Sequence, residues 1–121
     1  MRAGLDDPEV SLLVAEADER PAGFVGCGST RDPDPEPGVG EIRSFFVAAG
    51  SWRLGLGSAL MAAALEDLTR RGYAQATVWS FAGNQRANAF YEAHGFARDG
   101  AERTEDAWAG VPEVRLRRPL P

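Results

Sequence analysis

A glycine-bearing turn is the first stretch of this sequence with residues suited to chemistry. It runs Trp52-Arg53-Leu54-Gly55-Leu56-Gly57-Ser58, between a predicted strand and a predicted helix. Glycine lets the backbone approach a ligand closely, and the first N–H groups of a helix carry partial positive charge. The turn therefore predicts a binding site for an anion such as a pyrophosphate.

A second pattern follows further along the chain. It reads Asn84-x-x-Ala87-x-x-Phe90-Tyr91-Glu92-x-x-Gly95-Phe96. Ala87, Phe90, Tyr91 and His94 fall at helical spacing, so the pattern predicts a helix over 84–94 that ends at Gly95. Two residues of this pattern could take part in chemistry. Asn84 can cap the helix or bind a ligand, and the phenol of Tyr91 can donate a proton.

A sheet must position both patterns. Strands are predicted at 11–17, 22–29, 41–47, 75–81, 96–105 and 111–117, and a further helix from Leu56 or Gly57 to Arg71. Strand 41–47, that helix and strand 75–81 form a βαβ crossover with parallel strands. The other neighbours read as antiparallel hairpins. Residues 1–10, the acid-proline run 31–40 and residues 106–110 are expected to be loops, the second of them solvated. The fold class is α/β (α+β), a mixed sheet with helices.

Composition limits the function. The chain has 121 residues, which predicts a single domain over 1–121, and 44% of them are hydrophobic. A net charge of −5 disfavours nucleic acid as a partner and is compatible with a cationic substrate. No apolar run is long enough for a membrane helix, and one cysteine allows no internal disulfide, so a cytoplasmic protein is expected. No metal-ligand spacing is present.

Together, and in this order, the two motifs resemble the GNAT superfamily of N-acetyltransferases over residues 12–117. The resemblance implies a mixed, mostly antiparallel twisted sheet with a central parallel splayed strand pair and flanking helices. It also implies transfer of an acetyl group from acetyl-CoA to a primary amine of a small molecule or peptide by direct attack. Trp52 stands where the family usually has Arg or Gln, so pyrophosphate binding would depend on backbone N–H groups.

The resemblance also assigns roles to residues. Backbone groups of Phe45, Phe46 and Val47 would pair with the pantetheine arm and stabilise the oxyanion. The pyrophosphate loop would comprise Trp52, Arg53, Leu54, Gly55, Leu56, Gly57 and Ser58. Asn84 would contact the cofactor arm. Tyr91 would contact the cofactor and protonate the departing thiolate, and Glu41 would be the general base.

Structural roles remain open for the same residues. Tyr91 can be a core residue with a satisfied hydroxyl, and Glu41 can be an exposed strand residue, with a water chain as the base. Asn84 can act only as a helix N-cap. His94 favours a structural or capping role, and Cys27 that of a small buried hydrophobic residue.

Two other functions compete with catalysis. The first is a GNAT-fold module that binds acyl-CoA for regulation or assembly without transfer. The second is a dinucleotide-binding fragment, which the incomplete glycine pattern disfavours. Relative to the family, the usual N-terminal strand and helices, which wall the acceptor pocket, are expected to be absent. Either the chain starts late, or the acceptor site is unusually open, or a partner subunit fills the gap. A homodimer is expected to cover the apolar surface that their absence exposes.

Overall fold

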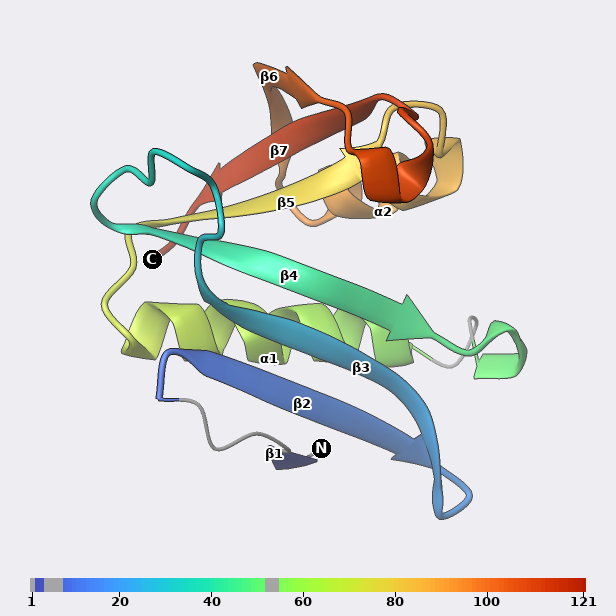
Figure 1. The fold of residues 1–121 in the computed structure, drawn as a ribbon. Helices are drawn as coiled ribbons and strands as arrows, with labels where there is room; N and C mark the ends of the chain where they lie inside the picture. The colour runs from blue at the N-terminus through green and yellow to red at the C-terminus, as the bar shows by residue number, and fades with distance from the viewer. Residues whose placement is uncertain (1, 4–7, 52–54) are drawn as a thin grey trace.

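The computed structural model describes residues 2–3, 8–51 and 55–121. Its strands form one sheet in the order β1-β2-β3-β4-β5-β7-β6, and Figure 1 shows the long helix α1 lying along the β2–β4 half. The elements are β1 (Arg2–Ala3), β2 (Val10–Ala17), β3 (Arg20–Ser29), β4 (Val39–Val47), η1 (Ala49–Ser51), α1 (Leu56–Arg70), β5 (Gln75–Phe81), α2 (Gln85–Ala93), β6 (Ala97–Arg103), η2 (Asp106–Trp108) and β7 (Glu113–Pro119).

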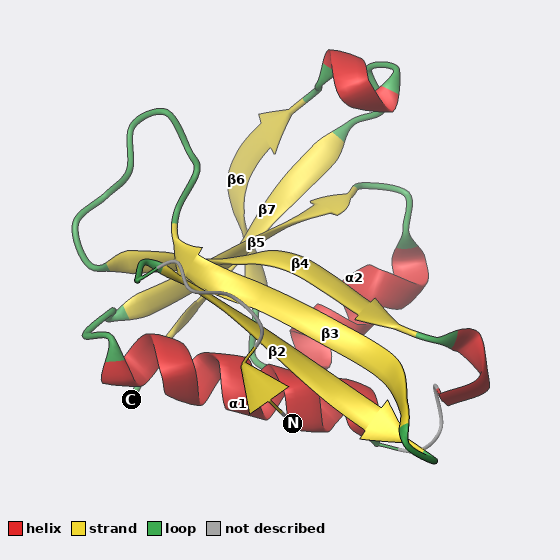
Figure 2. Cartoon of the chain, turned by 60° about the horizontal axis from the view of Figure 1, so that its bottom comes forward, coloured by secondary structure: helices red, strands yellow, loops and turns green. Residues whose placement is uncertain are grey.

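The sheet opens between its two central strands, which are parallel. β4 and β5 pair from Val39 with Gln75 as far as Ile42 with Val78, whereas every other described strand pairing is antiparallel. Beyond Ile42, β4 stays paired with β3 but diverges from β5, and the two halves of the sheet spread apart (Figure 2). The predicted splayed parallel pair and the GNAT-like fold class are therefore confirmed.

Helix α1 forms where its apolar residues make one stripe. Leu60, Met61, Ala64 and Leu68 are all fully buried, at the i, i+4 and i+3 spacing that places side chains on one helix face. They pack with Val25 and other strand residues in the core cluster. This burial against β2, β3 and β4 fixes the beginning of α1 beside the end of β4.

Side-chain hydrogen bonds cap helix α2 and hold it at the end of β5. Asn84 Oδ1 accepts a hydrogen bond from the Ala87 N–H at 3.1 Å, so the predicted N-cap is confirmed. Asn88 is buried, and its Nδ2 donates to the carbonyl oxygens of Phe81 (3.2 Å) and Ala82 (3.3 Å). His94 is the C-cap, in agreement with its predicted structural role.

Several predicted boundaries were wrong. Arg2 and Ala3 form a short strand because they pair with Val14 and Leu13 of β2, where a loop was expected. The last strand begins at Glu113, since the preceding Pro112 has no N–H for a sheet ladder. The predicted hairpin connection before it is confirmed, since β6 and β7 pair antiparallel, and it contains the 3-10 turn η2.

The acid-proline loop is solvated as predicted, since residues 33–38 are exposed, but Asp32 anchors one end of it. Asp32 accepts hydrogen bonds from Trp79 Nε1 at 2.8 Å and from Arg115 Nη1 at 3.0 Å, and its side chain is only 12% exposed. Glu36 pairs with Arg117 at 3.2 Å. These contacts tie the β3–β4 connection to β5 and β7, so the loop is a fixed part of the opened sheet.

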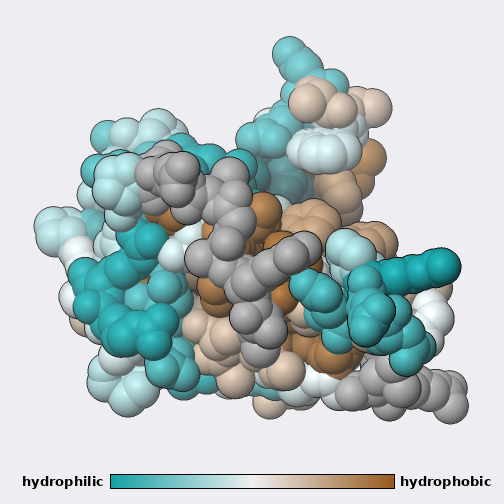
Figure 3. Space-filling model, turned by 90° about the horizontal axis from the view of Figure 1, so that it is seen from below, coloured by the Kyte–Doolittle hydropathy of each residue, from teal (hydrophilic) through white to brown (hydrophobic). Residues whose placement is uncertain are grey.

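On the surface, Phe24 and Phe46 are partly exposed and stack across β3 and β4, with ring centroids 5.7 Å apart. Seen from below, apolar residues gather toward the middle of the molecule, with hydrophilic side chains around them (Figure 3). Within residues 2–3, 8–51 and 55–121, no helix has the length and hydrophobicity needed to cross a membrane.

Candidate active site

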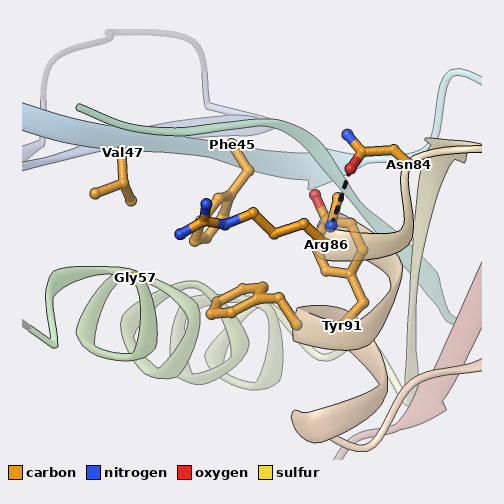
Figure 4. Close-up of a pocket in the computed structure, with 8 residues that line it drawn as sticks. Phe45, Val47, Gly57, Asn84, Arg86 and Tyr91 are labelled. Carbon is orange, nitrogen blue, oxygen red and sulfur yellow. Dashed lines mark hydrogen bonds between the residues drawn. The ribbon is translucent and has the colours of Figure 1, made fainter. Parts of the chain in front are cut away.

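A cavity of about 250 Å³ lies between the end of β4, the beginning of α1 and helix α2. We call it the inner cavity. It is lined by Phe45, Val47, Gly57, Asn84, Arg86, Ala87, Phe90 and Tyr91. Figure 4 shows Arg86 extending from α2 across this space. The inner cavity is mainly apolar, and among the described residues of its lining Arg86 alone is charged.

A wider cleft of about 580 Å³ opens where β4 and β5 diverge. We call it the open cleft. Its charged lining consists of Arg31, Glu41, Arg43, Arg103, Glu105 and Glu113. Trp79 and Trp108 stand on the β5–β7 side, and the Arg103 guanidinium lies 4.1 Å from the Trp79 ring centroid. The cleft is therefore much more polar than the inner cavity.

The two spaces meet at Tyr91. Phe45, Asn84, Ala87 and Tyr91 line both of them. Tyr91 is 8% exposed, and its ring packs edge-on against Phe45 and against Phe96 of the core. Burial raises the pKa of the Tyr91 hydroxyl above its ordinary value, so it stays protonated at neutral pH. A buried, protonated phenol at this junction can donate a proton to a leaving group in either space.

Glu41 lies in the open cleft and is 1% exposed, so the alternative of an exposed strand residue is wrong. Its Oε1 accepts hydrogen bonds from the Arg31 N–H at 2.7 Å and from Thr30 Oγ1 at 3.3 Å. Its Oε2 accepts one from Arg31 Nη2 at 3.1 Å. The carboxylate is thus held in place by charge-assisted bonds.

The beginning of α1 faces the inner cavity through Gly57. Gly55 is the N-cap with φ of 76°, and this residue has no side chain that could cap the helix. A Cβ on Gly57 would lie 3.3 Å from Phe90 Cε1, so glycine permits the close packing of α1 on α2. Ser58 Oγ lies 3.2 Å from His94 Nε2. The predicted anion-binding residues Trp52, Arg53 and Leu54 lie outside the described residues.

The end of β4 presents alternate side chains to opposite faces. Phe45 and Val47 line the inner cavity, whereas Phe46 is 52% exposed and stacks on Phe24. Of the three residues predicted to hold a pantetheine arm, Phe46 can therefore take part only through its backbone.

The structure adds residues that the sequence did not single out. Arg86 enters the inner cavity because it lies in the first turn of α2. Glu113 reaches the open cleft because β7 pairs with β5, where Glu113 is opposite Phe81. The position of Arg86 inside the second motif could have identified it as a site residue. No sequence pattern identified Glu113 as one.

Comparison with known proteins places the chain in a family. Residues 2–96 match the Acetyltransferase (GNAT) family. A mycothiol acetyltransferase from Paenarthrobacter aurescens (strain TC1) is 33% identical over 92 residues, which cover 76% of this chain and 28% of that protein. The chain thus spans just over a quarter of that relative's length.

Solved structures share the fold. A nourseothricin acetyltransferase superposes with a TM-score of 0.83 and 27% identity, covering 96% of this chain and 68% of that one. The PaiA N-acetyltransferase from Thermoplasma acidophilum, solved in complex with coenzyme A, gives 0.72 and 15% identity, covering 93% and 62%. With the sequence match over most of its length, the chain belongs to the GNAT family of acetyltransferases.

Proposed function

We propose that this protein transfers an acetyl group from acetyl-CoA to a primary amine of a small molecule or peptide. The observation that carries the proposal is the meeting of the inner cavity and the open cleft at Tyr91. Two substrates that enter from opposite sides would bring their reacting atoms together there. Family membership supports the same chemistry.

The inner cavity and the beginning of α1 would hold the pantetheine arm and pyrophosphate of acetyl-CoA. The first-turn N–H groups of α1, at Leu56, Gly57 and Ser58, would bind the pyrophosphate, because the Gly55 N-cap has no side chain to bond them. The register between β4 and β5 ends at Ile42, so an extended pantetheine arm can lie along the diverging edge of β4. Asn84 and Arg86 line the same space and would contact the arm and its charged end.

The amine would enter through the open cleft and attack the thioester carbonyl carbon directly. Glu41 would accept a proton from the ammonium group, and backbone N–H groups near Phe45 would stabilise the oxyanion. As the carbon–sulfur bond breaks, Tyr91 would protonate the CoA thiolate, and the second proton lost by the attacking nitrogen would restore the phenol. The products are the N-acetylated amine and CoA.

One observation favours a second function. Glu41 already accepts three hydrogen bonds, two of them from Arg31, as a structural carboxylate would. A module that binds acyl-CoA for regulation or assembly would need the inner cavity but no base. Release of free CoA in the presence of a panel of amines separates the two. Binding of acetyl-CoA without amine-dependent release would support the module.

We also propose that the protein forms a homodimer through the sheet face that carries Phe24 and Phe46. The stacked, partly exposed rings offer apolar surface that a second copy would bury. Light scattering at micromolar concentration tests this, and a Phe46→Ser variant should then be monomeric. A monomeric wild-type protein would contradict the proposal.

A further inference from the structure

Arg43 occupies an irregular position on β4. The pairing of β3 with β4 runs from Gly26 opposite Ser44 directly to Cys27 opposite Ile42, so Arg43 has no partner in the register. An extra residue of this kind is a β-bulge, which turns its side chain away from the regular alternation. Here the bulged side chain lines the open cleft.

The Arg43 guanidinium is fixed by neutral partners. Its Nε donates to the Ser29 carbonyl oxygen at 2.8 Å, and its Nη2 donates to Ser29 Oγ at 2.7 Å. The bulge itself is held by Arg31, whose Nη2 donates to the Arg43 carbonyl oxygen at 3.0 Å. These bonds use two of the five N–H donors of the guanidinium and position the rest.

The other arginines of the open cleft are neutralised. Arg31 pairs with Glu41 at 3.1 Å, and Arg103 pairs with Glu113 at 3.2 Å. Among the described residues, Arg43 pairs with no carboxylate. The β4 wall of the cleft therefore carries one positive charge in excess, on a side chain already held in one orientation.

The opposite wall has the reverse balance. Glu105 and Glu113 both lie near Arg103, at 3.6 and 3.2 Å, so two carboxylates face one guanidinium there. The open cleft is thus positive on its β4 side and negative on its β6–β7 side. A substrate with one charge of each sign complements both walls.

We propose that the acetyl acceptor is a small amino carboxylate, whose carboxylate binds Arg43. The inference rests on the proposed acetyltransferase function and names the acceptor class for that same cleft. A guanidinium binds a carboxylate through two parallel hydrogen bonds, and a guanidinium that is already oriented loses little freedom on binding. The ammonium group then lies on the side of the cleft with excess negative charge before it reaches the junction at Tyr91.

Matched substrate pairs test the proposal. Phenylalanine, lysine and histidine are each compared with their amides and with phenethylamine, cadaverine and histamine, and CoA release is measured. For at least one pair, the wild-type protein should prefer the acid by about tenfold or more in kcat/KM. Arg43→Gln should abolish that preference without changing the KM for acetyl-CoA, and Arg43→Lys should keep part of it. Arg98→Gln removes the same charge from an exposed β6 residue outside both cavities and should behave like wild type.

Calorimetry with the CoA-loaded protein gives a second readout with the same pairs. If no amine is acetylated but the acids bind about tenfold tighter than the amides, and Arg43→Gln loses this, the carboxylate site at Arg43 stands and the acetyltransferase function fails. If amines are acetylated and the amides are preferred, catalysis stands and the acceptor class is overturned. The proposed acceptor class is also overturned if Arg43→Gln loses as much affinity or rate for the amides as for the acids. It is overturned as well if no pair shows turnover or carboxylate-dependent binding.

Discussion

Phe45 and Tyr91 meet edge to face, with ring centroids 6.4 Å apart and ring planes at 81°, where the inner cavity joins the open cleft. One ring comes from the diverging end of β4 and the other from α2. The contact exists because β4 leaves β5 after Ile42 and α2 packs into the opening. The opening of the sheet thus places the phenol at the one boundary that both substrates would share.

Replacing Tyr91 with Phe should lower kcat by about 100-fold, because general acid catalysis typically contributes at least that much. The KM for acetyl-CoA should change little, since the ring and its contacts with Phe45 and Phe96 remain. Steady-state kinetics with one accepted amine checks both values. An unchanged kcat would remove Tyr91 from the mechanism.

The pH profile gives an independent test of Tyr91. Burial raises the pKa of its hydroxyl, so the proton is retained until the pH exceeds the ordinary tyrosine value of about 10. Any loss of rate caused by Tyr91 ionisation should therefore lie above that pH. A basic limb between about pH 8 and 9 that disappears in Tyr91→Phe would contradict this assignment.

Glu41 and Glu113 are both buried carboxylates of the open cleft, and comparison of their variants identifies the base. Glu41→Gln should lower kcat by about 100-fold near neutral pH, with recovery at high pH as the amine loses its proton without help. Glu113→Gln should reduce the rate only a few-fold. The reverse order would make Glu113 the base and Glu41 a structural partner of Arg31.

Arg86 is a charged residue of the inner cavity lining, and its removal should weaken cofactor binding. Arg86→Gln should raise the KM for acetyl-CoA by about tenfold and leave kcat nearly unchanged, since a charge-assisted hydrogen bond contributes about 1.5–3 kcal/mol. Arg98→Gln is the control for net charge. If acetyl-CoA affinity is the same in Arg86→Gln and wild type, Arg86 does not contact the cofactor.

Local patterns predicted much of this fold. Helix α1 was predicted from the apolar stripe of Leu60, Met61, Ala64 and Leu68. The two ends of α2 were predicted from Asn84 and Gly95. Both predictions succeed because helix burial and capping depend on residues close in sequence. The order of strand, helix and strand was sufficient to predict the parallel pair at the centre of the sheet.

Long-range contacts could not be predicted in the same way. The loop is exposed as predicted, but the anchoring of Asp32 by Trp79 and Arg115 could not be foreseen, because both partners are distant in sequence. The bulge at Arg43 has no glycine or proline to mark it and follows from the pairing of β3 with β4. Glu113 reaches the cleft only because β7 inserts between β5 and β6.

Gly57 should tolerate no side chain without loss. In Gly57→Ala the new Cβ would lie 3.3 Å from Phe90 Cε1, so the Phe90 ring in the inner cavity would have to shift by a few tenths of an ångström. We expect a KM for acetyl-CoA raised several-fold and a loss of about 1 kcal/mol in the free energy of unfolding. Gly50→Ala is the matched control, because its Cβ would meet nothing within 4 Å. Equal behaviour of the two variants would show that Gly57 is not required at the cavity.

Cys27 should be chemically silent in the folded protein. Its side chain is fully buried, and burial, with the Asp67 carboxylate 3.7 Å away, raises its pKa to about 12. At pH 8 a thiol-reactive dye should therefore label it slowly in buffer and rapidly in denaturant, and CoA release can be followed without background.

The thiol ionises first in the unfolded chain, near pH 8.5, so its contribution to stability is complete below that pH and declines as pH rises toward the folded value. Relative to Cys27→Ala, the wild-type protein should lose about 2 kcal/mol of unfolding free energy between about pH 8.5 and 10. Urea titrations measure this difference, and parallel pH dependence of the two proteins would mean that the thiol is not buried.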